Sequence, residues 1–221
     1  MKKALFLPLL LALAGPFSTV QAQSATPAHS AVESKVAMCI GCHGIKGYQA
    51  SFPEIHKVPM IAGQDAKFIV AALNAYKKGE RKHPTMRSIA ASLSEQDMAE
   101  AAAYYQQQGK DGAPAAAPEQ PAAAPAAVAA LLTKGACVSC HGANFSKPID
   151  GSYPKLAGQH ADYLYVALKA YKTEGNPNVG RGNAIMAGQV KQFSNVELKA
   201  MANYIGSLPS DLHTVPQAKF R

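Results

Sequence analysis

The sequence has no run of apolar residues long enough to cross a bilayer. Its longest apolar run, residues 4–14, is far shorter than the ~20 residues that a membrane-spanning helix needs. Lys2 and Lys3 precede this run and the small residues of Val20-Gln21-Ala22 follow it, which is the pattern of a cleaved export signal. We therefore predict that residues 1–22 are a signal peptide and that the mature protein is soluble in the periplasm.

Cysteine is scarce as well, with four residues in a chain of 221. Four cysteines in an exported protein normally suggest two disulfides. Here they form two close pairs, and a histidine directly follows each pair: Cys39-Ile40-Gly41-Cys42-His43 and Cys137-Val138-Ser139-Cys140-His141. Zinc ribbons and thioredoxin-like sites also use Cys-x-x-Cys pairs, but neither needs a histidine at this position.

The repeated Cys-x-x-Cys-His pentapeptide is the signature of covalent haem attachment in c-type cytochromes. The two thiols add to the two vinyl groups of the haem, and the two residues between them form a tight turn along that edge. The histidine that follows then faces the iron. The sequence therefore predicts two covalently bound haem c groups. Their attachment and iron-binding residues are Cys39, Cys42 and His43 in one unit, and Cys137, Cys140 and His141 in the other.

Alignment of the two motifs shows that the chain is a tandem repeat. The segment Pro59–Gln64 corresponds to Pro154–Gln159, and Ala75-Tyr76-Lys77 corresponds to Ala170-Tyr171-Lys172. Units of this size are domains rather than solenoid repeats. We predict a first domain at residues 23–112 and a second at residues 128–221.

The segment between the units, residues 113–127, consists almost entirely of alanine and proline. Such a segment has little to bury and is typical of a semi-extended linker. Pro125 could already open a helix that continues to Lys134, so we expect the flexible part to end near Ala124.

Helical patterns dominate both units, and no convincing strand alternation is present. The sequence predicts an all-α fold, with three main helices and long loops around each haem. Ser30 with Glu33, and Ser194 with Glu197, have the spacing of helix capping boxes. The other expected helices cover residues 65–78, 95–108 (capped by Ser94) and 160–172.

The second axial ligand of each iron distinguishes a carrier from a catalyst, because a catalyst needs an open position. Met86 and Met186 are the methionines found in both units, each eight residues before the serine that caps the last helix. We expect each to lie in a loop and to complete His/Met ligation of its iron. Four other histidines are rival ligands, and we interpret them as surface residues: His56, His83, His160 and His213.

These residues together resemble the cytochrome c4 family, whose members fuse two class I cytochrome c domains. The resemblance covers residues 30–208 and is most specific in the segment Tyr153–Gln159. It implies that Pro59 and Pro154 offer their carbonyls to His43 and His141. It also implies periplasmic electron transfer, often toward terminal oxidases, and face-to-face packing of the domains. The linker is longer than we expect for this family, so the sequence leaves open both packed domains and a flexible tether; we favour packing.

The charge balance bears on the partners. Lysine and arginine total 22 against 14 acidic residues, and the second unit is the more basic one, with ten basic and five acidic residues. Export argues against nucleic acid. The remaining interpretations are general solubility, or docking to redox proteins with acidic surfaces, such as a membrane-bound oxidase or a dehydrogenase.

The leading hypothesis is therefore a one-electron carrier, not an enzyme. A permanently bound subunit of a periplasmic dehydrogenase would carry the same motifs and stays open. A di-haem peroxidase would need an exchangeable axial position and acid–base groups above it, which the two matched methionines argue against. A haem sensor would need a signalling module, which we do not recognise in the sequence.

Overall fold

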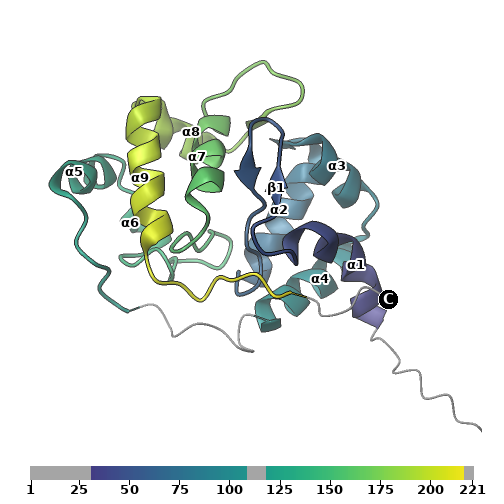
Figure 1. Cartoon of the computed structure of the whole chain (residues 1–221). Coiled ribbons are helices and arrows are strands. Elements are labelled where there is room, and N and C mark those ends of the chain that lie inside the picture. Colours follow the sequence, from purple (N-terminus) through teal and green to yellow (C-terminus); the bar gives the residue numbers. More distant parts are fainter. Residues whose placement is uncertain (1–30, 109–117, 217–221) are drawn as a thin grey trace, which may run out of the picture.

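The computed structural model describes residues 31–108 and 118–216, which form two helical units lying side by side (Figure 1). The predicted signal peptide, Ser30 of the first capping box and residues 113–117 of the predicted linker lie outside the described residues. The first unit contains α1 (Ala31–His43), α2 (Ala66–Lys78), α3 (Pro84–Ala91) and α4 (Glu95–Gln108). The second contains α5 (Ala126–Lys134), α6 (Val138–His141), α7 (Ala161–Ala170), α8 (Ala184–Lys191) and α9 (Asn195–Ser207).

The all-α prediction is confirmed, since the described strands are two residues long: β1 (Gln49–Ala50), β2 (His56–Lys57), β3 (Arg81–Lys82) and β4 (Gly180–Arg181). No helix in the described part of the chain is long and apolar enough to cross a membrane.

Local hydrogen bonds determine where several helices begin and end. Ser194 and Glu197 form a complete capping box at the start of α9, as predicted. Ser94 caps α4 in the same way, because its hydroxyl oxygen accepts from the Asp97 N–H at 3.1 Å. Helix α2 ends at Gly79, whose φ of 78° is a left-handed conformation that glycine adopts without strain.

The loop prediction for Met86 and Met186 is wrong, because both lie in the first turn of a short helix, α3 and α8 respectively. Pro84 occupies the first position of α3, where its fixed φ suits a helix and its missing N–H removes no bond. The side chains of His83 and Asn183 cap these two helices.

Each unit has its own apolar core beneath its long helices. In the first unit, α2 packs on α4, and α1 crosses α4. In the second, α7 packs on α9, and α5 also contacts α9. Lys35 of α1 forms ion pairs with Asp97 and Glu100 of α4, at 2.7 and 2.8 Å. These pairs join the first and last helices of the first unit.

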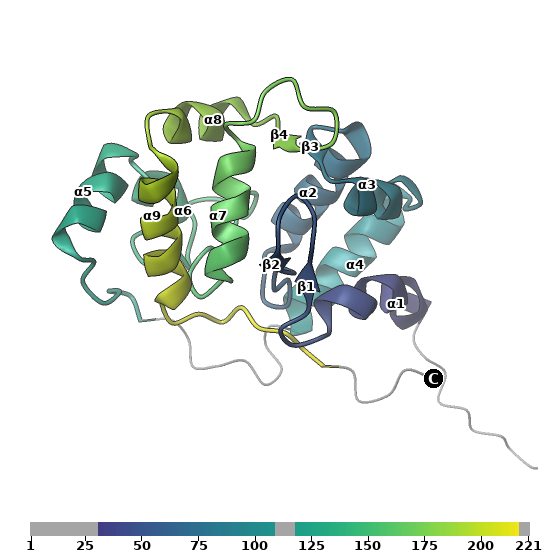
Figure 2. The ribbon, with the colours of Figure 1, turned by 45° about the horizontal axis from the view of Figure 1, so that its top comes forward.

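The two units contact each other directly, as the packed alternative requires. Strand β3 of the first unit pairs antiparallel with β4 of the second, with Arg81 opposite Arg181 (Figure 2). The chain after α9 crosses back to the first unit, where His213 N–H donates to the Ala62 carbonyl at 3.3 Å. A chain segment and a two-strand sheet therefore bridge the units.

The described end of the linker lies along the second unit. The Asn144 side chain donates to the Pro118 carbonyl at 3.2 Å, and the Tyr204 hydroxyl donates to the Ala122 carbonyl at 2.8 Å. These bonds attach the segment at Pro118 and Ala122 through backbone carbonyls, which an Ala/Pro composition leaves available.

Candidate haem-binding sites

In the first unit, the predicted attachment residues lie in the last two turns of α1. Cys39 and Cys42 are free thiols, and His43 ends the helix. The Nδ1 atom of His43 lies 2.8 Å from the Pro59 carbonyl oxygen, which can only accept a hydrogen bond. Nδ1 therefore carries the proton, and Nε2 keeps its lone pair for a metal. Removal from water lowers the pKa of His43, which keeps the imidazole neutral as a ligand must be.

The second unit reaches the same arrangement by a different backbone path. Helix α5 ends at Gly135, and the motif occupies the separate short helix α6. The Nδ1 atom of His141 lies 3.1 Å from the Pro154 carbonyl oxygen. Gly142 follows with φ of 78°, and a Cβ there would lie 2.0 Å from the Lys147 carbonyl oxygen. Only glycine permits this close return of the chain below the histidine.

The structure thus contains both histidine–proline hydrogen bonds that the family resemblance implies. Such a bond fixes the orientation of the imidazole and raises its basicity as a ligand. Each unit therefore presents two free thiols at the attachment spacing and one neutral, oriented imidazole. This donor set fits a covalently bound haem.

Met86 and Met186 occupy matched positions in the two units, and both are half-buried. The Met86 N–H donates to His83 Nδ1 at 3.4 Å, and the Met186 N–H donates to Asn183 Oδ1 at 2.9 Å. Met186 also packs against the apolar core of its unit. The structure places each methionine on a capped helix, and ligation of iron by its sulfur stays a prediction.

The surface interpretation of the four other histidines is wrong for His56, which is 5% exposed. Its Nδ1 lies 2.8 Å from the Glu54 carbonyl oxygen, and its ring lies 6.1 Å from that of Tyr163 in the other unit. The hairpin of β1 and β2 packs on α7, and this contact buries the residue. His83, His160 and His213 are half-buried.

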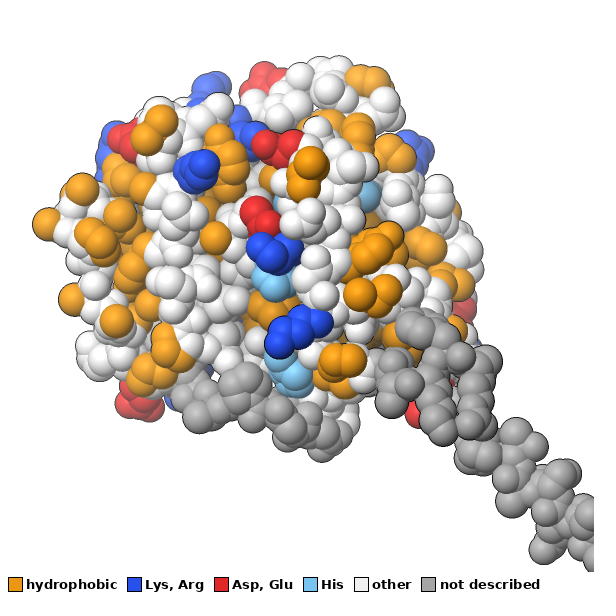
Figure 3. Space-filling model, viewed as in Figure 1, with side chains coloured by type: hydrophobic (Ala, Val, Ile, Leu, Met, Phe, Trp, Pro, Cys, Tyr) orange, Lys and Arg blue, Asp and Glu red, His pale blue; other side chains and the backbone are white. Residues whose placement is uncertain are grey.

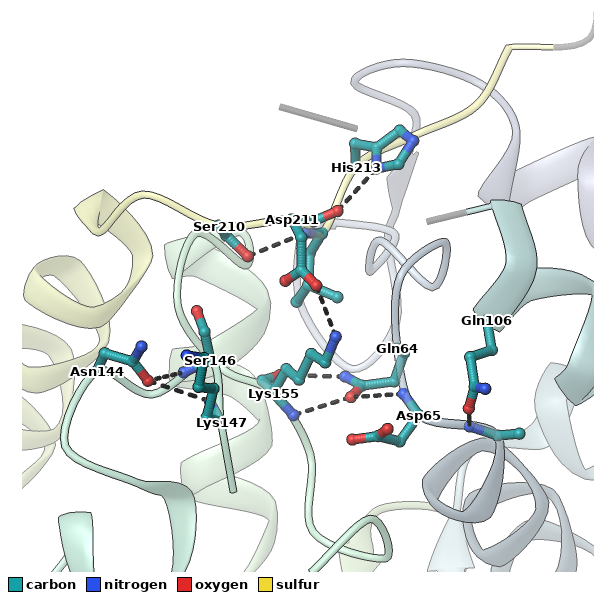
Figure 4. A network of polar contacts seen from close by, with 12 residues as sticks. Gln64, Asp65, Gln106, Asn144, Ser146, Lys147, Lys155, Ser210, Asp211 and His213 are labelled. Carbon is teal, nitrogen blue, oxygen red and sulfur yellow. Dashed lines mark hydrogen bonds and ion pairs between the residues drawn. The ribbon is translucent and has the colours of Figure 1, made fainter. Parts of the chain in front are cut away.

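Two buried glutamines, which the sequence analysis did not assign a role, join the two loops whose prolines bond to the histidines. Gln64 Oε1 accepts from the Lys155 N–H at 2.8 Å, and Gln64 Nε2 donates to the Lys155 carbonyl at 3.1 Å (Figure 4). Gln159 makes the same pair of bonds with Met60, at 3.0 and 2.8 Å. We call each pair of bonds a glutamine clamp. Met60 and Lys155 directly follow Pro59 and Pro154, so each clamp lies one residue from a carbonyl that bonds to a histidine.

Charged side chains reinforce the junction, and on the face shown in Figure 3 charged and histidine side chains gather along the line between the units. Lys57 pairs with Asp162 at 3.3 Å, and Glu54 pairs with Lys169. Arg181 is placed over the rings of Tyr163 and Tyr171, and its guanidinium donates to the Tyr163 hydroxyl at 3.0 Å.

Arg81 makes the matching contacts in the first unit, over Phe68 and Tyr76. Both arginines stand five residues before their methionine, a repeat that was visible in the sequence. The glutamines had a similar signal, since each ends the matched segment that begins at Pro59 or Pro154.

Two free-thiol Cys-x-x-Cys-His motifs, each with its histidine held by a prolyl carbonyl in an all-α unit, define a c-type cytochrome. The family model for cytochrome c matches residues 125–209. The chain is 32% identical to cytochrome c4 of Azotobacter vinelandii over 191 residues, which cover 81% of this chain and 88% of that protein. The chain belongs to the cytochrome c4 family, binds haem c covalently and is an electron-transfer protein.

Three further proteins are similar to the chain in sequence or in fold. The crystal structure of reduced cytochrome c4 from Pseudomonas stutzeri matches with a TM-score of 0.57 and 29% identity, over 81% of this chain and 97% of that chain. A thiosulfate dehydrogenase electron acceptor of Stutzerimonas stutzeri (strain A1501) is 31% identical, over 77% of this chain and 78% of that protein. A thiosulfate dehydrogenase structure from Marichromatium purpuratum matches with a TM-score of 0.56 and 26% identity, over 77% of this chain and 36% of that chain.

Proposed function

We propose that the chain is a periplasmic carrier with two haem c groups, one in residues 23–112 and one in residues 128–221, joined by residues 113–127. It passes single electrons from respiratory donors to an acceptor such as a terminal oxidase. The observation that carries the proposal is the pair of glutamine clamps, which directly link the two loops whose prolines orient His43 and His141. A carrier whose two sites are rigidly joined holds them at one separation, which suits transfer between them.

The predicted site residues of each unit have distinct roles in binding its haem. Cys39 and Cys42 attach one haem and Cys137 and Cys140 the other, so that neither group dissociates during turnover. His43 and His141 would each supply an imidazole ligand to an iron. Met86 and Met186 would supply thioether ligands, which raise the reduction potential. The haem supplies a one-electron couple, and the chain holds its ligands still so that electron transfer requires little rearrangement.

The mass of the denatured mature protein tests the cofactor count. It should exceed the mass of residues 23–221 by two haems, and the N-terminus should be Gln23. Replacement of Cys39 and Cys42 by alanine should remove one haem, and replacement of Cys137 and Cys140 should remove the other. A parent protein that retains one haem or none would contradict the proposal.

A second candidate function is electron acceptance from a thiosulfate dehydrogenase, because a relative bears that name and a thiosulfate dehydrogenase structure contains a similar fold. The chain would then be either a separate acceptor or a bound subunit. Oxidised chain mixed with a purified thiosulfate dehydrogenase and thiosulfate should be reduced, as seen in the visible haem spectrum. Co-purification from the native periplasm would favour the subunit, and isolation of the chain alone would favour the carrier.

A further inference from the structure

Tyr105 of α4 carries a buried hydroxyl that has no hydrogen-bond partner of good geometry among the described residues. The side chain is 5% exposed and belongs to the apolar core of the first unit. A polar group that is buried without a partner is costly, so such a group calls for an explanation. Phenylalanine would fill the same space without that cost.

A residue of the haem-attachment site shares the core cluster of this tyrosine. Cys39 packs against the same core cluster as Tyr105. Burial raises the pKa of the Cys39 thiol, and the neighbouring Tyr105 hydroxyl acts to lower it. The Tyr105 carbonyl accepts from the Gly63 N–H at 3.0 Å, and this bond holds the residue in place.

The second unit lacks this hydroxyl. The Ile205 carbonyl accepts from the Gly158 N–H at 3.0 Å, which is the same backbone contact at the repeat-equivalent position. Ile205 is 6% exposed, and Cys137 packs against the core cluster that contains it. At this repeat-equivalent position the first unit therefore has a buried hydroxyl and the second unit has none.

We propose that the Tyr105 hydroxyl donates a hydrogen bond to the sulfur of Cys39 once the haem is attached, and so raises the reduction potential of the first haem alone. The attached sulfur is a thioether, which has no proton and can only accept. A donor that points its positive end at the haem stabilises the reduced state, in which the haem carries less positive charge. The inference rests on the proposed function in one respect, namely that the first unit carries a haem.

The test begins with the mass of the parent and of Tyr105→Phe, because two haems in both proteins separate this inference from the cofactor count. Each protein is then titrated potentiometrically and followed in the visible spectrum. Tyr105→Phe should move one wave to lower potential, by a shift equivalent to about fivefold in that haem's equilibrium, which is the size of one hydrogen bond. The other wave should stay in place. Met86→His identifies the wave of the first unit, because it changes that iron's axial ligand.

Tyr104→Phe is the matched control. It removes a hydroxyl from the residue of α4 that precedes Tyr105, and both waves should stay in place. Resonance Raman spectra give a second readout, which a purely packing role would not affect. The carbon–sulfur vibration of the first haem should respond to exchange of water for heavy water in the parent and not in Tyr105→Phe. Unmoved waves in Tyr105→Phe, or an equal shift in Tyr104→Phe, would overturn the inference.

Discussion

Gln64 and Gln159 form equivalent pairs of hydrogen bonds across the two units. The side chain of each binds the backbone N–H and carbonyl of one residue in the other unit, Lys155 for Gln64 and Met60 for Gln159. Both glutamines are nearly fully buried, at 3% and 4% exposed. The contact is therefore reciprocal, and it connects the loops that orient His43 and His141. Any movement of one unit relative to the other would therefore strain or break hydrogen bonds to both loops.

The clamps should make the two units unfold together. The double variant Gln64→Leu, Gln159→Leu removes the side-chain partners of Lys155 and Met60 while it keeps similar volume. Each buried backbone group left unpaired costs about 1–3 kcal/mol, so a single calorimetric transition should become two. Gln106→Leu is the control, because Gln106 accepts from the Ala66 N–H within the first unit. One unchanged transition in the double variant would contradict a role for the clamps.

Met86→Ala should abolish the weak near-infrared band of a methionine–iron bond in the first haem only, and the reduction potential of that haem should fall. The second haem should keep its band until Met186 is also replaced. Met98→Leu is the matched control, because Met98 is fully buried in α4 and its repeat equivalent is Leu198. A near-infrared band that persists in the double variant would show that another residue binds the irons.

The ion pairs of Lys35 should make the first unit sensitive to acid. Lys35 lowers the pKa of Asp97 and of Glu100, and it is the largest cause of both shifts. A carboxyl group with a lowered folded-state pKa stabilises the fold above its unfolded-state pKa, near 4, and that contribution is lost as the pH falls toward the folded-state pKa. The free energy of unfolding should therefore decrease from about pH 5 downward.

Lys35→Met should weaken this decrease, as measured by urea unfolding at a series of pH values. Lys78→Met, which removes an exposed positive charge from α2 of the same unit, should leave the pH dependence as in the parent. If both variants lose stability equally at every pH, the dependence has another origin.

Association with an acidic redox partner should depend on charge at α8, the helix that carries Met186. Lys191 and Ile185 are both exposed on this helix, so a positive charge and an apolar side chain lie on the helix of the predicted iron ligand. Lys191→Glu should slow electron transfer several-fold at low salt, because exposed charges steer the encounter. The effect should fade toward 1 M salt, where the Debye length is about 3 Å.

Stopped-flow reduction at a series of salt concentrations measures this effect, with Lys78→Glu on the first unit as the control. A transfer rate that does not change with salt in the parent would indicate a subunit that is already docked to its partner.

The sequence alone determined what depends on neighbouring residues. Cysteine spacing with an adjacent histidine specifies haem attachment, because thiols and imidazole must reach one macrocycle from one turn of chain. The capping residues Ser94 and Ser194 predicted the start of the last helix of each unit, because a cap bonds to a backbone group three residues away. Repeated motifs likewise revealed the two units before any tertiary contact was considered.

Only the tertiary structure decided what depends on segments about a hundred residues apart meeting in space. The burial of His56, the clamps of Gln64 and Gln159 and the pairing of β3 with β4 all arise where the units touch. The buried hydroxyl of Tyr105 lies within the core of the first unit, and it too is a tertiary feature, since the sequence of a helix does not show whether a tyrosine oxygen has a partner. Local patterns encode hydrogen bonds within a turn of chain, whereas burial and pairing across an interface are properties of the assembled fold.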